Sequence, residues 1–234
     1  MKHYPLLYPY IPRQAILKEL RETLSGRYLG QGPKVNKFEE EFNKKFGYQY
    51  SVFLNSGTSA LELAYHLIGI KSGDEVIVPV LDAPAGQVGL VRRGAKIVFV
   101  DIERGTLNLD PDDLQRNITP KTKAIVAVHL GGVAVNKKVF EIAKERNIPI
   151  IVDLAQDMDP QSGKYGDYLI YSFQAIKAIT TADGGMLVVR SKAEYDRAKK
   201  LRWFGIDREK RNRNNWKKRE MTFNIEEAGY KFQP

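Results

Sequence analysis

The chain has 234 residues, and 43% of them are hydrophobic, which is enough for one large domain or two small ones. It contains no cysteine, which excludes disulfides, thiolate nucleophiles, thiolate zinc sites and cysteine-bound iron–sulfur clusters. We predict no metal site, and we expect a cytoplasmic protein because the composition fits a reducing compartment.

The formal net charge of +9 comes mainly from one stretch, residues 197–219, while the rest of the chain is nearly balanced. This stretch fits either a solvated basic helix and loop or a basic rim for a small diphosphate ligand. Nucleic-acid binding is the least favoured interpretation, because no recognised nucleic-acid motif accompanies the charge.

No segment of the sequence predicts a membrane span or a signal peptide. The N-terminal apolar stretch, MKHYPLLYPYIPRQ, is too short and too often broken by proline. The most apolar later segment, residues 75–91, carries Asp82 and two prolines.

Along the chain, the segment before residue 50 predicts N-terminal helices that pack on a sheet. Short apolar runs then alternate with helical patterns, which is typical of a parallel sheet with helices on both faces. The expected strands are residues 51–55, 75–79, 96–100, 123–130, 148–153, 168–173 and 185–189. A helix over 58–69 has apolar residues spaced to form one face. We therefore predict an α/β fold, a mostly parallel sheet flanked by helices, as one domain over residues 1–234 with a helical segment over about 1–48.

Three motifs carry the predicted chemistry, and the first is Ser56-Gly57-Thr58 at a strand-to-helix junction. A small turn of this kind lets backbone N–H groups approach an anion at the positive end of a helix. The alternative is an ordinary helix N-cap, which the same residues also favour.

The second motif is Asp153, which ends an apolar run, with Gln156 three residues later. A carboxylate at the carboxyl end of a parallel strand lies where open α/β sheets bind ligands. If a pyridine ring lies there, Asp153 holds its nitrogen protonated and Gln156 reaches its phenolic oxygen. The alternative is that Asp153 caps a helix.

The third motif combines Ser172, whose hydroxyl suits a phosphate, with Lys177, which lies between a buried strand and the Gly184-Gly185 turn. A lysine in this place lines a cleft more readily than it decorates a surface. An amine that forms an imine must be partly neutral, which burial and a nearby cationic ring favour. Because the three motifs occur in this order, together they are specific.

These residues resemble the DegT/StrS-type sugar aminotransferases, and the resemblance runs from about Tyr28 to Tyr230. It includes Gly32-Pro33-x-Val35-x-x-Phe38-Glu39, SGTSALELA, GDEVIVP, Gly94-Ala95-x-x-Val98-Phe99-Val100-Asp101, ITPKTKAIVAVHLGG, the Asp153/Gln156 pair and the Ser172/Lys177 pair. The segment FQAIKAITTADGG looks like the branch that includes perosamine synthases. The resemblance implies the large domain of a type-I, aspartate-aminotransferase-like transferase that depends on pyridoxal 5'-phosphate (PLP).

The resemblance also implies a role for each motif residue. Lys177 and Asp153 are the implied catalytic residues: Lys177 holds PLP as an internal aldimine and later moves the proton, and Asp153 pairs with the ring nitrogen. The implied contacts to the ring oxygen and to the phosphate come from Ser56, Gly57, Thr58, Gln156, Ser172 and Lys231, the last from a partner subunit. His129 is predicted to be structural.

The implied reaction is amino transfer from an amino acid, usually glutamate, to a keto nucleotide sugar. The resemblance and the apolar N-terminal segment predict a homodimer. Three departures favour a second hypothesis, a truncated or degenerate paralogue that binds PLP or a partner chain without turnover. Ala83 stands where a ring-stacking aromatic is expected, Asp157-Met158-Asp159 replaces Ala-His-Gly, and the chain stops before the expected small C-terminal domain. A third hypothesis, a PLP-dependent sugar dehydratase, fits less well, because Lys177 is present and cysteine is absent.

Overall fold

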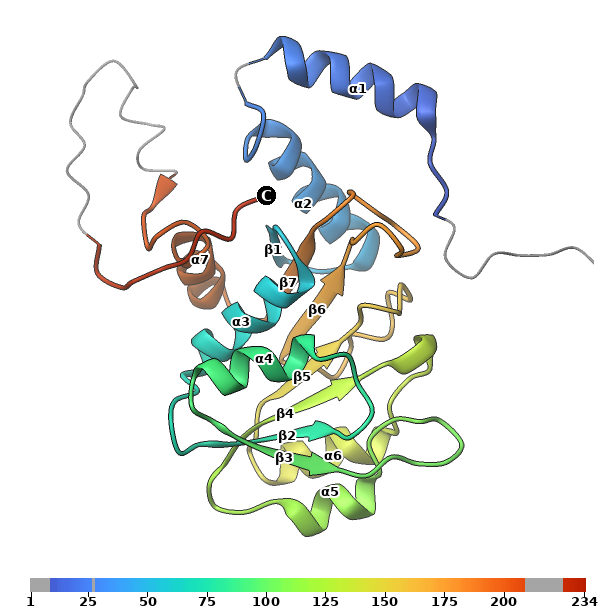
Figure 1. Cartoon of the computed structure of the whole chain (residues 1–234), viewed down its shortest axis with the longest axis vertical. Coiled ribbons are helices and arrows are strands. Elements are labelled where there is room, and N and C mark those ends of the chain that lie inside the picture. Colours follow the sequence, from blue (N-terminus) through green and yellow to red (C-terminus); the bar gives the residue numbers. More distant parts are fainter. Residues whose placement is uncertain (1–8, 27, 209–224) are drawn as a thin grey trace, which may run out of the picture.

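The computed structural model describes residues 9–26, 28–208 and 225–234. Its centre is one seven-stranded sheet with the strand order β1-β7-β6-β5-β4-β2-β3 (Figure 1). The strands are β1 Tyr50–Leu54, β2 Glu75–Pro79, β3 Lys96–Val100, β4 Thr122–Val128, β5 Ile150–Asp153, β6 Tyr168–Ser172 and β7 Gly185–Val189. All seven predicted strands are confirmed, with ends that differ by two residues at most.

The sheet is mostly parallel, as predicted. Strands β3, β2, β4, β5 and β6 run parallel to one another, whereas β7 is antiparallel to both β6 and β1. The reason is local: β6 returns into β7 through a loop without a crossover helix, and a parallel neighbour needs such a crossover.

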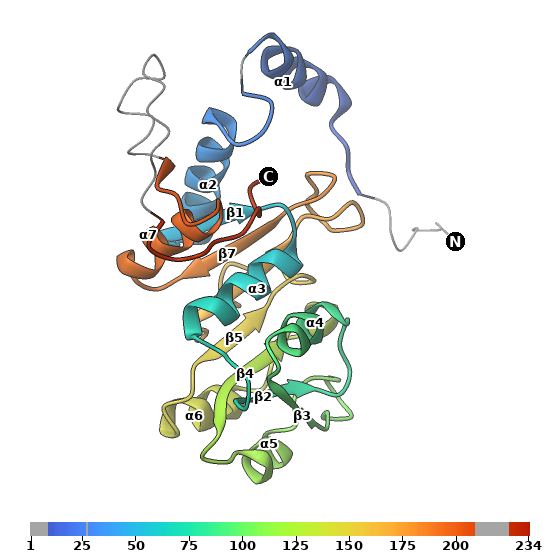
Figure 2. The same ribbon diagram turned by 60° about the vertical axis from the view of Figure 1, so that its left-hand side comes forward.

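Helices cover both faces of the sheet (Figures 1 and 2). The helices are α1 Arg13–Ser25, α2 Pro33–Phe46, α3 Gly57–Ile68, α4 Ala85–Arg92, α5 Pro111–Asn117, α6 Lys137–Glu145 and α7 Lys192–Leu201. Buried side chains of α3, α4 and α7 join one apolar cluster, and those of α2, α5 and α6 join the cluster on the opposite face.

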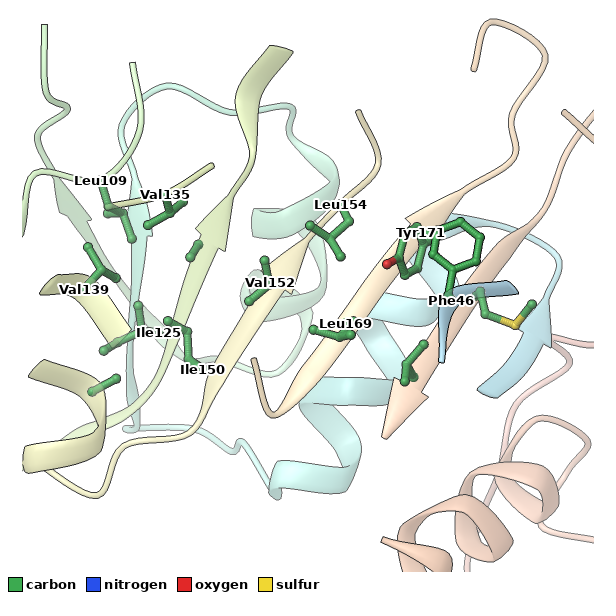
Figure 3. Packing of buried hydrophobic residues seen from close by; sticks show 14 of the residues in the cluster. Phe46, Leu109, Ile125, Val135, Val139, Ile150, Val152, Leu154, Leu169 and Tyr171 are labelled. Carbon is green, nitrogen blue, oxygen red and sulfur yellow. The ribbon is translucent and has the colours of Figure 1, made fainter. Parts of the chain in front are cut away.

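The strands are buried on both faces, which explains why they read as continuous apolar runs. Along β4, for example, Ile125 and Ala127 belong to the cluster beneath α2, α5 and α6, and Val126 belongs to the cluster beneath α3 and α4. Figure 3 shows the first cluster, in which Tyr171 lies beside Phe46 and the aliphatic residues continue across the sheet.

The expectation that the N-terminal helices pack on the sheet is right for α2 and wrong for α1. Helix α2 buries Phe42 and Phe46, which are one turn apart and therefore lie on one face. Helix α1 has no buried residue and stands clear of the sheet (Figures 1 and 2). Lys34 of α2 bonds Glu22 of α1 at 2.9 Å and also pairs with Glu19.

Helix α7 is held in place by arginine–carboxylate pairs. Arg202, which follows α7, is 1% exposed and donates from Nη1 to Glu39 Oε1 at 2.6 Å and to Phe53 O at 2.9 Å. Arg197 of α7 donates to both carboxylate oxygens of Glu227, at 2.9 and 2.6 Å. These contacts join α7 to α2, to β1 and to the segment 225–234.

The segment 225–234 runs back to the beginning of α3 (Figure 2). Asn55 N donates to Phe232 O at 2.9 Å, and Phe232 N donates to Arg202 O at 3.0 Å. Lys231 forms an antiparallel bridge with Trp203. Within these described ranges, no helix has the length and apolarity needed to cross a membrane.

Candidate active site

The residues of the predicted anion site lie at the beginning of α3. Ser56 is the N-cap residue, and its Oγ accepts from Ser59 N at 3.0 Å. The N-cap interpretation is therefore correct for the Ser56 side chain. The N–H groups of Gly57 and Thr58 form no hydrogen bond with the described part of the chain. Unpaired N–H groups at the positive end of a helix attract an anion.

Glycines allow the beginning of α3 to approach the ends of β6 and β7. A Cβ added to Gly57 would lie 3.3 Å from the Ser172 Cβ and 3.6 Å from its Oγ. A Cβ on Gly185 would lie 2.3 Å from the Ser56 carbonyl and 2.5 Å from Gly57 N, which is a clash. The structure therefore brings Ser56, Gly57 and Ser172 together, with a hydroxyl beside unpaired N–H groups.

Asp153 lies at the carboxyl end of β5, where the sequence predicts a ligand-binding carboxylate. It is 8% exposed, and its Oδ1 accepts from Ala155 N at 2.8 Å. No helix begins there, so the alternative of a capping residue is wrong. Burial raises the pKa of Asp153, and the charge of Lys177 opposes that shift.

Lys177 lies in the loop between β6 and β7 and is half-buried. The loop folds back on itself, because Lys177 N donates to Gln174 O and Thr181 N donates to Phe173 O, each at 2.9 Å. Asp153 and Ser172 end neighbouring strands, so the loop carries Lys177 to the same edge of the sheet.

Gln156 is exposed, and its Oε1 accepts from Gly131 N at 2.8 Å. Its contact with a ring oxygen stays a prediction. The backbone of Lys231 lies beside Asn55, whose Nδ2 is 3.5 Å from Lys231 O. Its contact with the phosphate of a partner subunit also stays a prediction.

His129 lies on the face of the sheet opposite to the candidate site. Side chains alternate between the two faces of a strand, and His129, directly after β4, continues the set of Ile125 and Ala127, which face α5 and α6. His129 Nδ1 bonds Asp157 Oδ2 at 2.8 Å, and both side chains are buried. Burial raises the pKa of Asp157, but hydrogen bonds from Ser162, Asp159 N and His129 outweigh it and leave the pKa below its usual value. This pairing supports a structural role for His129.

Sequence reasoning missed Asp82, in the loop between β2 and α4. Its pKa is raised to about 7 by burial and by the nearby charge of Asp153. The two carboxyls therefore lie within electrostatic reach of each other. The signal available in the sequence was its position three residues after a predicted strand, at the same edge as Asp153.

The basic stretch 197–219 is only partly described. Arg197 and Arg202 bind carboxylates, as above, whereas Lys199, Lys200 and Arg208 line a cavity of about 440 Å³ between α7 and the beginning of α2. None of the predicted site residues lines this cavity. Residues 209–219 lie outside the described residues.

The site suits a ligand that has an anion at one end and a ring nitrogen at the other. Unpaired N–H groups and Ser172 suit a phosphate, a buried carboxylate suits a protonated nitrogen, and Lys177 brings a primary amine. The residues present therefore fit PLP. Among the described residues, no group of three histidine or acidic side chains is placed to hold a metal ion.

Comparisons with known proteins agree with this geometry. The model of the DegT/DnrJ/EryC1/StrS aminotransferase family matches residues 11–233. The chain belongs to this family. It is 34% identical over 237 residues to the spore coat polysaccharide biosynthesis protein SpsC of Bacillus subtilis (strain 168), which covers 97% of this chain and 59% of that protein. It is also 36% identical over 214 residues to the GDP-perosamine synthase of Escherichia coli O157:H7, covering 88% of this chain and 58% of that enzyme.

Solved structures in the family share the fold. The PMP form of a putative sugar aminotransferase from Streptococcus pneumoniae has a TM-score of 0.88 at 28% identity, covering 98% of this chain and 64% of that one. The PLP form of the same protein has a TM-score of 0.86. These likenesses confirm the predicted type-I large-domain fold. The chain spans just under 60% of the length of the two curated relatives.

Proposed function

We propose that this domain binds PLP through Lys177 and that the protein transfers an amino group from glutamate to a keto nucleotide sugar. The observation that carries the proposal is the meeting of Lys177 and the buried Asp153 at one edge of the sheet, beside the unpaired N–H groups of α3. Membership in a family of aminotransferases and the likeness to a GDP-perosamine synthase support the substrate class.

Each residue has a role in the proposal. Gly57, Thr58 and Ser172 hold the phosphate, with Ser56 fixing the helix start through its cap. Asp153 holds the ring nitrogen protonated, and Gln156 and Lys231 complete the contacts. PLP supplies an electron-withdrawing ring when bound. The Lys177 amine would bind PLP and would be the group that takes up and returns a proton during the reaction.

An assay with ¹⁵N-glutamate tests the reaction. The PLP-saturated protein is incubated with a panel of keto nucleotide sugars, and mass spectrometry detects a ¹⁵N-amino sugar. We expect labelled product from the unmodified chain and none from Lys177→Met. The absence of ¹⁵N transfer to any keto sugar would contradict the proposed reaction.

Ala83 favours a second candidate function, PLP binding without turnover. No aromatic side chain is available at this position to stack on the ring, which forfeits roughly 0.5–1.5 kcal/mol beyond area burial. Visible absorbance with added PLP separates this candidate from a chain that binds no cofactor, and the ¹⁵N assay separates it from an active enzyme.

We also propose a cytoplasmic homodimer with cofactor sites near the interface. The exposed Ile16, Leu17 and Leu20 of α1 support self-association, because they form an apolar surface that the described chain does not cover. The lack of cysteine supports the compartment. Sedimentation at micromolar concentration is expected to show a dimer, and a monomer alone would contradict it. Cell fractionation tests the location.

A further inference from the structure

Asp82 is a carboxylate at the candidate site with one firm hydrogen bond. Its Oδ1 accepts from Ala83 N at 2.6 Å. Its Oδ2 packs on the beginning of α4, because a Cβ added to Gly86 would lie only 2.9 Å away. Gln87 Nε2 lies 3.5 Å from Oδ2, which is long for a hydrogen bond. When the Gln87 amide is turned over, its nitrogen donates instead to Ala83 O at 2.8 Å and to Pro84 O at 3.2 Å.

Among the described residues, the groups that face Asp82 add negative charge or none. Asp153 from β5 is the charged group that acts on it directly. Tyr65 of α3 donates its hydroxyl to Gly86 O at 2.6 Å, and burial followed by the Asp153 charge keeps its pKa well above the usual value, so it stays neutral. Glu62, farther along α3, is balanced by Arg93.

Asp153, like Asp82, accepts a hydrogen bond from a backbone N–H of the described residues, that of Ala155. Lys177 acts on Asp153 through its charge. Asp82 follows β2 and Asp153 ends β5, and only β4 lies between these two strands, so both carboxyls lie at the same edge of the sheet. Two carboxyls near each other in a partly buried site resist being ionised together. Each of the two carboxyls accepts one short hydrogen bond from a backbone N–H of the described chain, a bond that an asparagine oxygen would also accept.

We propose that Asp82 is a positioning residue for the ring nitrogen of the cofactor, and that Asp82 and Asp153 together hold one proton until a pyridine nitrogen takes it. This inference rests on the proposed function. Asp82 would also attract the charged cofactor ring, which the Ala83 side chain cannot hold by stacking.

The proton transfer balances without another reactant. Before it, the carboxyl pair carries one negative charge and the ring nitrogen is neutral. The O–H bond of the carboxyl breaks, the N–H bond of the ring forms, and two carboxylates then face one cationic nitrogen. The total charge is unchanged, and the attraction of both carboxylates to the cationic nitrogen would offset the repulsion that the second negative charge introduces.

The first experiment uses the cofactor-free protein with ¹³C-labelled aspartate carboxyls, followed by NMR through a pH titration. Asp82→Asn and Asp153→Asn assign the two signals. We expect Asp82 to titrate near 7, and its midpoint to fall by about one unit or more in Asp153→Asn. An Asp82 signal that titrates in the ordinary range, or that ignores Asp153→Asn, would overturn the inference.

The second experiment measures the binding of PLP and of its deaza analogue, in which a benzene ring replaces the pyridine, by fluorescence at pH 7.5. We expect Asp82→Asn to weaken PLP about tenfold, as one pKa unit of interaction corresponds to a tenfold change. The deaza analogue should bind the variant and the unmodified chain equally. Equal losses for both ligands, or no loss for PLP, would overturn the inference.

Asp101→Asn is the matched control. Asp101 follows β3 at the same edge, is exposed, and its Oδ1 accepts from the next backbone N–H at 2.8 Å, as Asp82 does. We expect its PLP affinity to be unchanged, and a tenfold loss there too would overturn the inference. An unmodified chain that binds no PLP would refute the proposed function and this role together, whereas normal PLP binding without carboxyl coupling would refute only the role of Asp82.

Discussion

Buried and partly buried carboxylates occur in two regions of this chain, around α7 and at the edge of the sheet. Around α7, Glu39 and Glu227 each bind an arginine at about hydrogen-bond distance, 2.6 Å in both cases. The pKa of Glu227 falls to about 2, because Arg197 and then His66 bind its charged form and outweigh partial burial. At the edge of the sheet, neither Asp82 nor Asp153 binds an arginine of the described residues, and burial raises the pKa of both.

This comparison distinguishes carboxylates that stabilise the fold from carboxylates that are placed to bind a ligand. A buried carboxylate with a matched cation holds elements together, and its charged form is the stable one. A buried carboxylate without such a partner costs stability unless a ligand completes it. The same sequence thus stabilises the fold around α7 and, where a cationic ring is expected, leaves two carboxyls that no arginine of the described residues binds.

Arg202→Met should give the largest effect on stability. It leaves Glu39 charged in the core without its partner, and breaking a buried pair in this way costs about 3–5 kcal/mol. Urea denaturation measures the free energy of unfolding. Arg116→Met is the control, because its pair with Asp113 is exposed and should contribute under about 1 kcal/mol. Equal effects of the two changes would remove one side of the comparison.

Asp153→Asn should act in the opposite way. The asparagine oxygen keeps the bond to Ala155 N, and the buried charge disappears, so the free energy of unfolding should rise by about 1 kcal/mol at neutral pH. PLP affinity should fall about tenfold or more, because the ring nitrogen loses its counter-charge. A variant that is less stable, with unchanged PLP affinity, would show that Asp153 is structural.

Asp82→Asn should change how stability depends on pH. The folded-state pKa of Asp82 is raised, so the folded chain binds more protons than the unfolded chain between about pH 4 and 7, and stability falls as pH rises through this window. The variant should match the unmodified chain at pH 4 and exceed it by about 1 kcal/mol at pH 8, a value reduced for the partial exposure of Asp82. Urea denaturation at the two pH values checks both the sign and the window.

Ala83→Phe should have the smallest effect of the four substitutions. Unlike the other three, it changes no charge and only adds an apolar contact to the cofactor. A ring stacked on the cofactor is worth about 0.5–1.5 kcal/mol, so PLP affinity should rise two- to tenfold. Val80→Phe, three residues earlier and also exposed, is the control and should leave the affinity unchanged. Equal gains at the two positions would mean that Phe acts through general apolarity rather than through stacking.

The strands, and the strand-to-helix turn where an anion site is expected, could be predicted because their signals are local. The β2 strand is a continuous apolar run, and Gly57 follows a strand directly, so neighbours in sequence determine both. The places of Asp153 and Lys177 in the fold could be predicted for the same reason, since Asp153 ends β5 and Lys177 lies in the loop between β6 and β7.

The remaining features depend on contacts between distant residues. Asp82 approaches Asp153 because the sheet places β4 between β2 and β5, and no local pattern reveals that strand order. Glu39 and Arg202 are 163 positions apart, so their ion pair left no mark in either segment. The apolar stripe of α1 resembles that of a covered helix, and only the tertiary structure shows that it is exposed.

The central claim is that Lys177 holds PLP, and borohydride reduction followed by peptide mapping tests it most directly. The protein is saturated with PLP, reduced and digested, and the modified residue is identified by mass spectrometry. The account predicts a pyridoxyl group on Lys177 that is absent from Lys177→Met. A label on another lysine, or no label at saturating PLP, would contradict it.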